Sequence, residues 1–255
     1  MKISFDKRKN YILDCIKKKG KVYVNELSKE LKISSMTIRR DLNKLEKEGL
    51  INRIHGGAIN LDINVFETPF NTRLNKNLEK KQRIAFAAVN FISKGDIIAL
   101  DTGTTTLQIA KLLINARNLT IITTNMHIVG QLINNSHIKL ILPAGLVRPG
   151  EGSLTGNFTI NTLQNFYFDK LFLSASSIDC GKGITDYTSE DAAIKKQLIK
   201  NSREIIAVMD SSKFNTISLI QIADLEQIHT LITDAEPPKS LLNELNKHNI
   251  KIIIA

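Results

Sequence analysis

The sequence predicts an α/β protein: a small N-terminal domain of helices and a β-ribbon, followed by a larger domain with a mostly parallel sheet. Two patterns lead to this prediction. In residues 78–255, short apolar runs alternate with helical patterns, which is typical of parallel strands covered by helices on both faces. In residues 1–58, three short amphipathic segments stand beside two strand-like runs. The length of 255 residues fits two domains of ordinary size.

The N-terminal domain is expected to contain three helices. Apolar residues at helical spacing predict the first within residues 7–19. Asn25 is expected to cap the second helix, and Ser34 is expected to cap the third. The strand 50–54 is expected to pair with the strand 22–24. Three helices and a two-stranded ribbon are typical of a winged helix-turn-helix.

The second domain is expected to follow a linker. Residues 59–77 are polar, rich in asparagine and too irregular for a domain of their own, so we expect them to join residues 1–58 to residues 78–255. A helix is predicted over 78–92. Strands are predicted at the continuous apolar runs 97–100, 120–123, 138–142, 170–173, 205–209, 231–233 and 250–254. The pattern does not fix the direction of the edge strands.

Basic side chains are concentrated in the first quarter of the chain. Residues 1–58 hold 15 Lys and Arg against 7 Asp and Glu, a net charge of +8 out of the total of +10. This asymmetry favours a polyanion as the partner of the N-terminal domain. A solvated, lysine-rich surface without a partner is the alternative interpretation.

The third helix has a polar face suited to reading DNA. Hydroxyl groups and amides at a helix N-terminus contact phosphates, and arginine pairs with guanine O6 and N7. The expected DNA-contacting residues are Ser34, Ser35, Met36, Thr37, Arg39, Arg40, Asn43 and Lys44 on the helix, with Arg53 and His55 on the wing. A helical packing module, or a winged helix that binds protein, would show the same pattern.

A second motif, Asp101-Thr102-Gly103-Thr104-Thr105-Thr106, lies between a predicted strand and a predicted helix. Free N–H groups at the helix N-terminus and threonine hydroxyls are donors for an anion, and Gly103 permits close approach. The glycine spacings of Walker and dinucleotide-binding loops are missing. We therefore expect an anion site at Asp101, Gly103, Thr104, Thr105 and Thr106. A threonine-capped helix without a ligand is the alternative.

Polar residues also follow other predicted strands or open other helices. In an open α/β sheet, groups at the carboxyl ends of the strands converge on one pocket. The candidates are Asn125, Gly145, Asp179, Asp191, Lys195, Asp210 and Lys213. Asp191 and Lys195 stand four residues apart on a predicted helix, so a solvated ion pair is the alternative for these two.

Ordered sets of residues in both domains resemble the DeoR family of bacterial transcriptional regulators. In the first domain they are Thr37-Ile38-Arg39-Arg40-Asp41-Leu42, Leu45-Glu46 and Arg53-Ile54-His55-Gly56-Gly57-Ala58. In the second they are Leu100-Asp101 with the threonine loop, Thr124-Asn125, Gly145 to Arg148, Ile178-Asp179, Glu190-Asp191 with Lys195, and Asp210 to Phe214. Together they cover nearly the whole chain.

The resemblance implies roles for individual residues. Thr37, Arg39 and Arg40 would lie in or at the edge of the major groove. From its negative charge, Asp41 is expected to orient a nearby arginine rather than to contact a phosphate. The second domain would be a sensor related in fold to ribose-5-phosphate isomerase and CoA-transferase-like domains, and it would bind a phosphorylated sugar or polyol.

In such a sensor the threonine loop would hold the phosphate, and Arg148 would belong to the same effector site. Asp179, Asp210 and Lys213 would lie near the hydroxyl groups. The chain departs from the family pattern at Ala144, Ser174 and Ser177, where the family favours glycine. A serine at a position that needs a positive φ would strain or narrow the pocket.

These observations predict a DNA-binding transcriptional regulator, a repressor of a sugar or polyol operon. Its binding to operator DNA would be controlled by a phosphorylated effector, and the chain would form a homo-oligomer, a dimer or a tetramer. One alternative is a phosphosugar isomerase-like enzyme with a DNA-binding appendage, whose acids and bases would be Asp101, Asp179, Glu190, Asp191 and Lys213. Another is an architectural protein that binds DNA without sequence preference.

Cofactors, metals and membranes are not expected. Cys15 and Cys180 are far apart and lack metal-ligand spacing, so neither a disulfide framework nor a zinc site is predicted. The chain has no apolar run of about 18 residues, and its basic start lacks the hydrophobic region of a secretory signal. A cytoplasmic protein is therefore expected, with no catalytic residues of its own.

Overall fold

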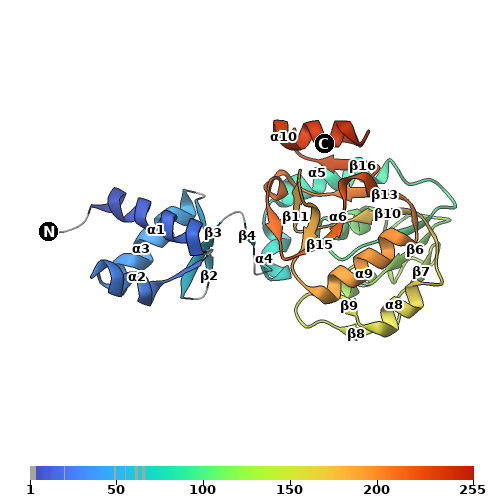
Figure 1. Cartoon of the computed structure of the whole chain (residues 1–255). Coiled ribbons are helices and arrows are strands. Elements are labelled where there is room, and N and C mark those ends of the chain that lie inside the picture. Colours follow the sequence, from blue (N-terminus) through green and yellow to red (C-terminus); the bar gives the residue numbers. More distant parts are fainter. Residues whose placement is uncertain (1–3, 20, 49, 55, 61–62, 65–66) are drawn as a thin grey trace. The chain divides into compact units, whose positions relative to one another are not determined.

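The computed structural model describes residues 4–19, 21–48, 50–54, 56–60, 63–64 and 67–255. The chain divides into two compact units, Met1–Val65 (unit 1) and Phe66–Ala255 (unit 2), shown in Figure 1. Unit 1 combines helices with a small sheet, and unit 2 is built on a large parallel sheet. The predicted α/β fold class is confirmed.

Unit 1 has the three predicted helices. Ser34 caps the third, as predicted, because its hydroxyl accepts a hydrogen bond from the Thr37 amide at 3.3 Å. The prediction that Asn25 caps the second helix is wrong. This helix begins at Val24, whose N–H donates to the Gly56 carbonyl at 2.8 Å. The elements are α1 (Phe5–Lys19), β1 (Lys21–Tyr23), α2 (Val24–Leu31), α3 (Ser35–Lys47), β2 (Ile51–Ile54), β3 (Gly57–Asn60) and β4 (Ile63–Asn64).

The sheet of unit 1 has three antiparallel strands in the order β1–β3–β2. The predicted direct pairing of β2 with β1 is wrong, because β3 lies between them. Glycine is required where β3 begins, since a Cβ on Gly57 would stand 2.1 Å from the Val22 carbonyl oxygen. The core beneath the sheet consists of Ile12, Ile16, Val22, Val24, Leu27, Ile38, Leu42, Leu45, Ile51 and Ala58.

All seven strands predicted for the second domain form one sheet in unit 2. Every pairing within it is parallel, and the order is β17–β16–β13–β10–β5–β6–β7. The strands are β5 (Ile97–Leu100), β6 (Thr120–Thr123), β7 (Lys139–Ile141), β10 (Phe168–Leu173), β13 (Ser202–Val208), β16 (Thr230–Thr233) and β17 (Lys251–Ile254).

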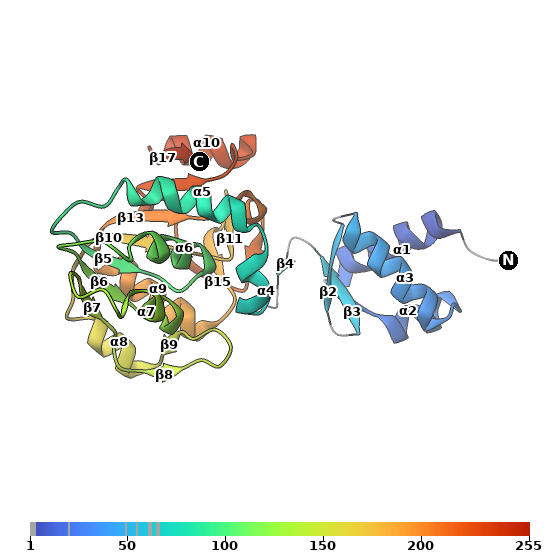
Figure 2. The same ribbon diagram turned by 180° about the vertical axis from the view of Figure 1, so that it is seen from behind.

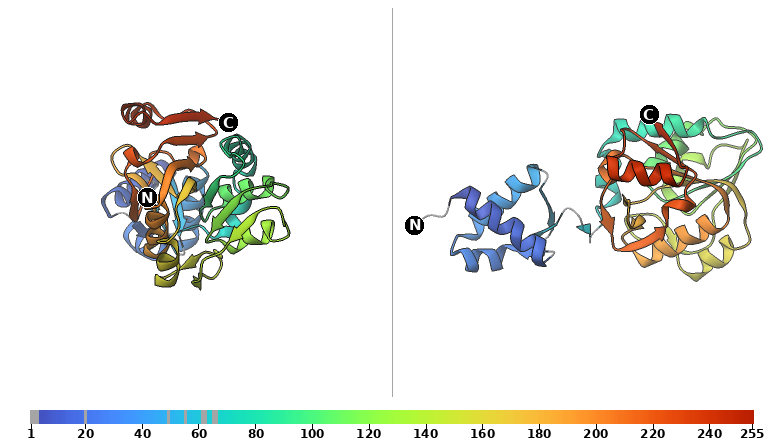
Figure 3. Two further views of the ribbon diagram at one scale, coloured as in Figure 1. Left: turned by 90° about the vertical axis from the view of Figure 1, so that its right-hand side faces the viewer. Right: turned by 45° about the horizontal axis from the view of Figure 1, so that its top comes forward.

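Helices cover both faces of this sheet, as Figures 1 and 2 show from opposite sides. Neighbouring residues of β10 point to opposite faces: Leu171 packs in the cluster with α8, α9 and α10, and Phe172 in the cluster with α5, α6 and α7. Figure 3 shows α10, which contributes Leu241 and Leu245. The helices are α4 (Phe70–Asn75), α5 (Leu78–Val89), α6 (Thr104–Leu112), α7 (Met126–Leu132), α8 (Asn157–Leu163), α9 (Ser189–Lys200) and α10 (Lys239–Lys247).

The strand order creates a topological switch point between β5 and β10. From β5 the chain adds β6 and β7 on one side, then returns to place β10 on the other side and continues outward through β13, β16 and β17. In open α/β sheets, ligands bind outside the carboxyl ends of the strands at such a point. Here those ends lead into Asp101 and Ser174.

The sequence analysis missed several smaller elements of unit 2. Part of the expected linker 59–77 is folded: residues 67–77 contain α4, and Phe70 is 1% exposed and stacked on the ring of His127 at 4.4 Å. Two small sheets, one further strand and two short helical turns were also not predicted. One sheet consists of β8 (Leu146–Val147) and β9 (Leu154–Thr155), and the other of β11 (Ser177–Asp179), β12 (Gly183–Asp186) and β15 (Ile220–Ala223). The further strand is β14 (Ile217–Ser218), and the turns are Ser211–Lys213 and Leu225–Gln227.

Candidate functional site

Helix α3 turns a polar face away from the core of unit 1. Met36 is 61% exposed, and the long side chains of Arg39 and Arg40 are exposed as well. In the described part of the chain, neither guanidinium has a hydrogen-bonding partner. Both arginines are therefore available to an external acceptor such as a phosphate or a guanine edge.

Other expected DNA-contacting residues interact within unit 1. The hydroxyls of Ser34 and Thr37 are 2.9 Å apart at the start of α3, next to the half-buried Ser35. The ammonium of Lys44 lies 3.9 Å from the ring centroid of Phe5. These contacts stabilise the helix and its position against α1. They form within unit 1 and do not require DNA.

Two polar contacts hold α3 from either side. Arg53 on the wing strand β2 donates a hydrogen bond to Asn43 Oδ1. From α1, Arg8 donates to both oxygens of Asp41, at 2.5 and 2.9 Å. Asp41 is 4% exposed and binds an arginine, as its charge predicts, although this arginine lies outside the recognition helix. His55 lies outside the described residues.

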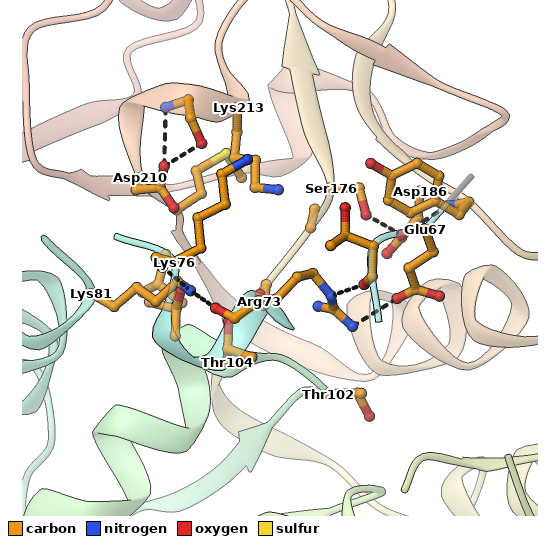
Figure 4. A pocket seen from close by; sticks show the side chains of 18 of the residues that line it. Glu67, Arg73, Lys76, Lys81, Thr102, Thr104, Ser176, Asp186, Asp210 and Lys213 are labelled. Atoms are coloured by element: carbon orange, nitrogen blue, oxygen red, sulfur yellow. Dashed lines mark hydrogen bonds and ion pairs between the residues drawn. The ribbon is translucent and has the colours of Figure 1, made fainter. Parts of the chain in front are cut away.

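Unit 2 has a polar pocket at the switch point (Figure 4). Its walls come from the carboxyl ends of β5, β10 and β13, from the start of α9, and from residues 67–81. Of the expected effector residues, six line it: Thr104, Thr105, Asp191, Lys195, Asp210 and Lys213. The structure thus gathers into one site residues that are more than 100 positions apart in the sequence.

One end of the pocket is rich in cations. Lys76, Lys81 and Lys213 line it together with Arg73. Burial lowers the pKa of Lys213, and the nearby charges of Arg73 and Lys76 lower it further, although Asp210 opposes them. Across the described ranges of the chain, the ammonium groups of Lys76 and Lys213 form no ion pair. Their positive charge is therefore available to an anion.

Lys81 fixes the segment that carries two of these cations. Its ammonium donates to the main-chain carbonyls of Arg73 and Lys76, where α4 ends. Burial lowers the pKa of Lys81 to about 8, and Lys213, Arg73 and Lys76 contribute in the same direction. A bound anion at this end would relieve the repulsion among the four groups.

Lys195 forms a buried ionic centre beside the pocket. Its ammonium lies 2.6 Å from Asp101 and 3.1 Å from Asp186, and it also donates to the Ser174 carbonyl. Burial alone would lower the pKa of Lys195, but the two carboxylates more than offset it and raise the value. Burial raises the pKa of Asp101 despite Lys195. For Asp186, Lys195 and Ser176 outweigh burial and lower the pKa.

Opposite charges alternate along the other side of the pocket. Asp191 accepts a hydrogen bond from Arg148, which also binds Glu67. Glu67 accepts from Arg73 at 2.9 Å, and Arg73 in turn binds Glu151. We call these five residues the charge ladder. Arg148, an expected effector residue, does not line the pocket and instead joins two acids that do.

The remaining expected effector residues have contacts inside the fold. Thr106 donates to the Asp101 carbonyl at 2.7 Å, and Asn125 caps α7 by accepting from two of its amides. A Cβ on Gly145 would lie 2.0 Å from a threonine hydroxyl of α8. Asp179 accepts from two amides of the turn that follows it. Of the five acids and bases of the enzyme alternative, Asp191 and Lys213 line the pocket, whereas Asp101, Asp179 and Glu190 do not.

The departures from the family pattern leave the backbone unstrained. Lys32, Asn77, Asn118, Asn215 and Asn249 are the described non-glycine residues with positive φ. Ala144, Ser174 and Ser177 are not among them, so the expected strain is not present. Ser174 does line the pocket, whereas the Ser177 hydroxyl is buried 2.8 Å from that of Ser218.

Several pocket residues were missed because of where they stand in the sequence. Glu67, Arg73, Lys76 and Asn77 fall in the stretch expected to be a linker. The spacing of Phe70 and Leu74, which lie on one side of α4, was the available helical signal. Asp186 ends β12 and Tyr187 directly follows it, in a small sheet with no marked apolar pattern.

Comparisons with known proteins place both units. Residues 8–64 match the DeoR-like helix-turn-helix domain, and residues 76–235 match the DeoR C terminal sensor domain. The chain belongs to the DeoR family of transcriptional regulators. This DeoR-family regulator is 33% identical over 245 residues to the glycerol-3-phosphate regulon repressor of Escherichia coli (strain K12), covering 96% of this chain and 97% of the relative.

Other relatives also match over almost their full length. The HTH-type transcriptional regulator GolR of Listeria innocua is 34% identical over 248 residues, 97% of this chain and 98% of GolR. The L-fucose operon activator of Haemophilus influenzae is 32% identical over 247 residues, 97% and 99% of the two chains. These relatives are named as regulators of transcription, which favours a regulator over an enzyme.

Similarity to solved structures is distant. Ribose 5-phosphate isomerase A from Methanocaldococcus jannaschii aligns with a TM-score of 0.41 and 19% identity over 54% of each chain. The full-length sorbitol operon regulator SorC of Klebsiella pneumoniae aligns over 99% of this chain and 97% of SorC, with a TM-score of 0.38 and 11% identity. Among the helices that the structure describes, none is long and apolar enough to cross a membrane. In the same residues, His, Cys, Asp and Glu form no group of three that could hold a metal ion.

Proposed function

We propose that this DeoR-family regulator is a cytoplasmic repressor of a sugar or polyol operon and that a phosphorylated sugar or polyol controls its binding to operator DNA. The names of relatives that cover nearly the whole chain support the operon class: a glycerol-3-phosphate regulon repressor, an aga operon repressor and an L-fucose operon activator. Two of these three relatives are named repressors and the third an activator, so we propose repression because it is the more frequent name.

The observation that carries the effector class is the pair of unpaired cations, Lys76 and Lys213. Lys213 is partly buried, and partial burial of a positive charge without an ion-pair partner is costly. Lys76 is exposed and adds a second cation beside it, so a phosphate dianion at this end would be bound by both. The first turn of α6 adds the positive end of a helix dipole and the hydroxyls of Thr104 and Thr105. The expected phosphate site is therefore extended from the threonine loop to these lysines.

The rest of the pocket suits a hydroxylated ligand. Asp210 accepts from Asn77 at 3.0 Å, and both side chains line the site with Thr102 and Ser176. Carboxylate, amide and hydroxyl groups pair readily with the vicinal hydroxyls of a sugar or polyol. The ligand would be bound rather than converted, and its unequal affinity for two states of a homo-oligomer would decide whether operator DNA is held.

Thermal unfolding of the full chain tests this proposal. Glycerol 3-phosphate, ribose 5-phosphate and glucose 6-phosphate are compared with their unphosphorylated parents and with inorganic phosphate. We expect at least one phosphorylated compound to raise the melting temperature and its parent to have no effect, because only a ligand that binds the folded form stabilises it. The same compound should release a duplex selected by the protein from a random pool.

Lys213→Gln and Lys182→Gln form a matched pair of variants. Lys182 is exposed and lies outside the pocket, so its variant should respond as the unsubstituted chain does. Lys213→Gln should lose most of the stabilisation by the phosphorylated compound while it still binds DNA. Equal stabilisation by a parent sugar, or an unchanged response of Lys213→Gln, would exclude the proposed phosphate site.

A further inference from the structure

Arg53 directs its guanidinium from the wing strand β2 to the recognition helix α3. Its Nε donates to the Gly57 carbonyl at 3.0 Å, across the β2–β3 hairpin. Its Nη1 donates to the Arg39 carbonyl at 3.4 Å and to Asn43 Oδ1. All three acceptors belong to unit 1. The side chain therefore links the wing to the helix within unit 1.

Asn43 lies in the middle of the exposed face of α3. Residues of an α-helix are separated by about 100° around its axis, so Met36, Arg40 and Asn43 fall on one side. The buried residues Ile38, Leu42 and Leu45 fall on the opposite side. Asn43 is exposed and is thus among the side chains nearest to a base edge when this face enters a major groove.

The contact with Arg53 fixes which way the Asn43 amide is turned. A guanidinium has only donors, so the amide must present its oxygen to Arg53 and direct its NH2 group elsewhere. Asparagine recognises adenine with both groups, since the oxygen accepts from N6 while the nitrogen donates to N7. With its oxygen turned toward Arg53, the amide cannot also present that oxygen beside its NH2 group to one base, as the bidentate contact with adenine requires.

We propose that Arg53 is a positioning residue that turns the Asn43 oxygen toward the wing and leaves its NH2 donors to read DNA, so that the base facing Asn43 is selected for acceptors and against adenine. Guanine, with N7 and O6, is the base whose major-groove edge fits best. The proposal depends on DNA binding by unit 1 and is independent of the effector. It also implies that base reading is shared by Arg39, Arg40 and Asn43, while the wing arginine acts through the helix.

Selection of duplexes from a random pool by the full chain gives the preferred sequence, and four variants are then compared on it. Asn43→Asp keeps an acceptor for Arg53 but removes the donors. Arg53→Met keeps the apolar stem without donors, and Arg53→Lys keeps the charge without the planar fork. Arg203→Met removes an exposed arginine of unit 2 as the matched control.

We expect Asn43→Asp and both Arg53 variants to lose guanine preference at the same single base pair. The loss should be about fivefold or more, which is the lower range for one specific base contact. The Arg53 variants should also gain tolerance for adenine there, because the Asn43 oxygen is released. The dependence of affinity on salt should stay as it is in the unsubstituted chain, and Arg203→Met should change nothing.

Three results would overturn the proposal. If Arg53 contacts a phosphate, Arg53→Met lowers the slope of log affinity against log salt concentration by about 1, and Arg53→Lys restores that slope. The sequence preference is then the same in all variants. If Arg53 only stabilises the wing, affinity falls equally for every sequence, with faster amide exchange in α3 and β3. If the unsubstituted chain selects no sequence at all, unit 1 does not read bases, a failure that leaves effector binding to unit 2 testable by itself.

Discussion

The Lys195 ammonium and the Asp101 carboxylate lie 2.6 Å apart, although 94 residues separate them in the sequence. Asp101 also accepts from the Ser174 amide at 3.1 Å, and Lys195 donates to the carbonyl of the same residue. The pair thus joins the loop after β5, the loop after β10 and helix α9 at the switch point. Both side chains are at most 5% exposed, so their main role is to fix the pocket floor.

Lys195→Met should strongly destabilise unit 2. The substitution leaves the carboxylates of Asp101 and Asp186 buried without their shared cation, and breaking a buried pair in this way costs about 3–5 kcal/mol. Chemical denaturation of the full chain, followed through the unit 2 transition, measures the loss. Lys196→Met, at the exposed neighbouring position, is the control and should stay within about 0.5 kcal/mol of the unsubstituted chain. Similar free energies of unfolding for the two variants would contradict this role of the pair.

Gly103→Ala should destabilise unit 2 through a steric contact. The φ of Gly103 is 176°, which any residue adopts, but a Cβ there would stand 2.5 Å from the Cβ of Ser174. Overpacking of this kind costs about 1–3 kcal/mol. Ser174→Gly removes the obstructing atoms while it keeps the backbone bonds to Asp101 and Lys195. The double variant should therefore recover most of the lost stability, and a double-mutant cycle with zero coupling would refute the steric explanation.

The large elements of the fold were predictable because their sequence signals are local. Continuous apolar runs gave all seven strands of the parallel sheet, and the helical spacing of Ile38, Leu42 and Leu45 gave α3. The position of β3 was not predictable in the same way. Its pairing depends on the close approach of Gly57 to β1, a tertiary contact without a signature in hydropathy.

The candidate site was predictable only where polar residues directly follow a strong strand or open a helix. Thr104, Asp210 and Lys213 satisfy this condition, and they line the pocket. Glu67 and Lys76 do not, since a short polar helix separates them and their stretch has the composition of a linker. Asp179 shows the converse case, since it is the last residue of β11, it accepts hydrogen bonds in the turn that follows, and it does not line the pocket.

Substitutions in the charge ladder should separate effector binding from DNA release. Arg148 joins Asp191, which lines the pocket, to Glu67, which stands at the start of the described part of unit 2. Glu67→Gln weakens this connection and the ion pair with Arg73, while it leaves Lys76, Lys81 and Lys213 unchanged. We expect a phosphorylated compound to stabilise the variant nearly as well as the unsubstituted chain, with less complete release of DNA at saturation. Glu226→Gln, at an exposed site, is the control. Complete release of DNA by Glu67→Gln at saturating compound would show that the charge ladder does not couple occupancy of the pocket to DNA binding.

Affinity for a phosphorylated effector should fall above pH 8. Burial, together with Lys213, Arg73 and Lys76, lowers the pKa of Lys81 to about 8 in the free protein. A dianion in the pocket favours the charged lysine, so it raises this pKa again. Between about pH 7 and 8 Lys81 is already protonated and the phosphate is still a dianion, so affinity should be nearly constant there. Above pH 8 binding must take up a proton, and affinity should decrease by up to about tenfold per pH unit.

Lys81 also makes the free energy of unfolding depend on pH. The unfolded chain keeps the ordinary pKa of 10.5, so between pH 8 and 10.5 it binds more protons at Lys81 than the folded chain does. This lysine therefore makes the ligand-free protein more stable as pH rises through that window. Calorimetric titrations in two buffers with different ionisation enthalpies measure the proton uptake directly. Lys81→Met should bind more weakly and lose the part of the uptake due to Lys81, whereas an identical pH profile in this variant would assign the proton to another group.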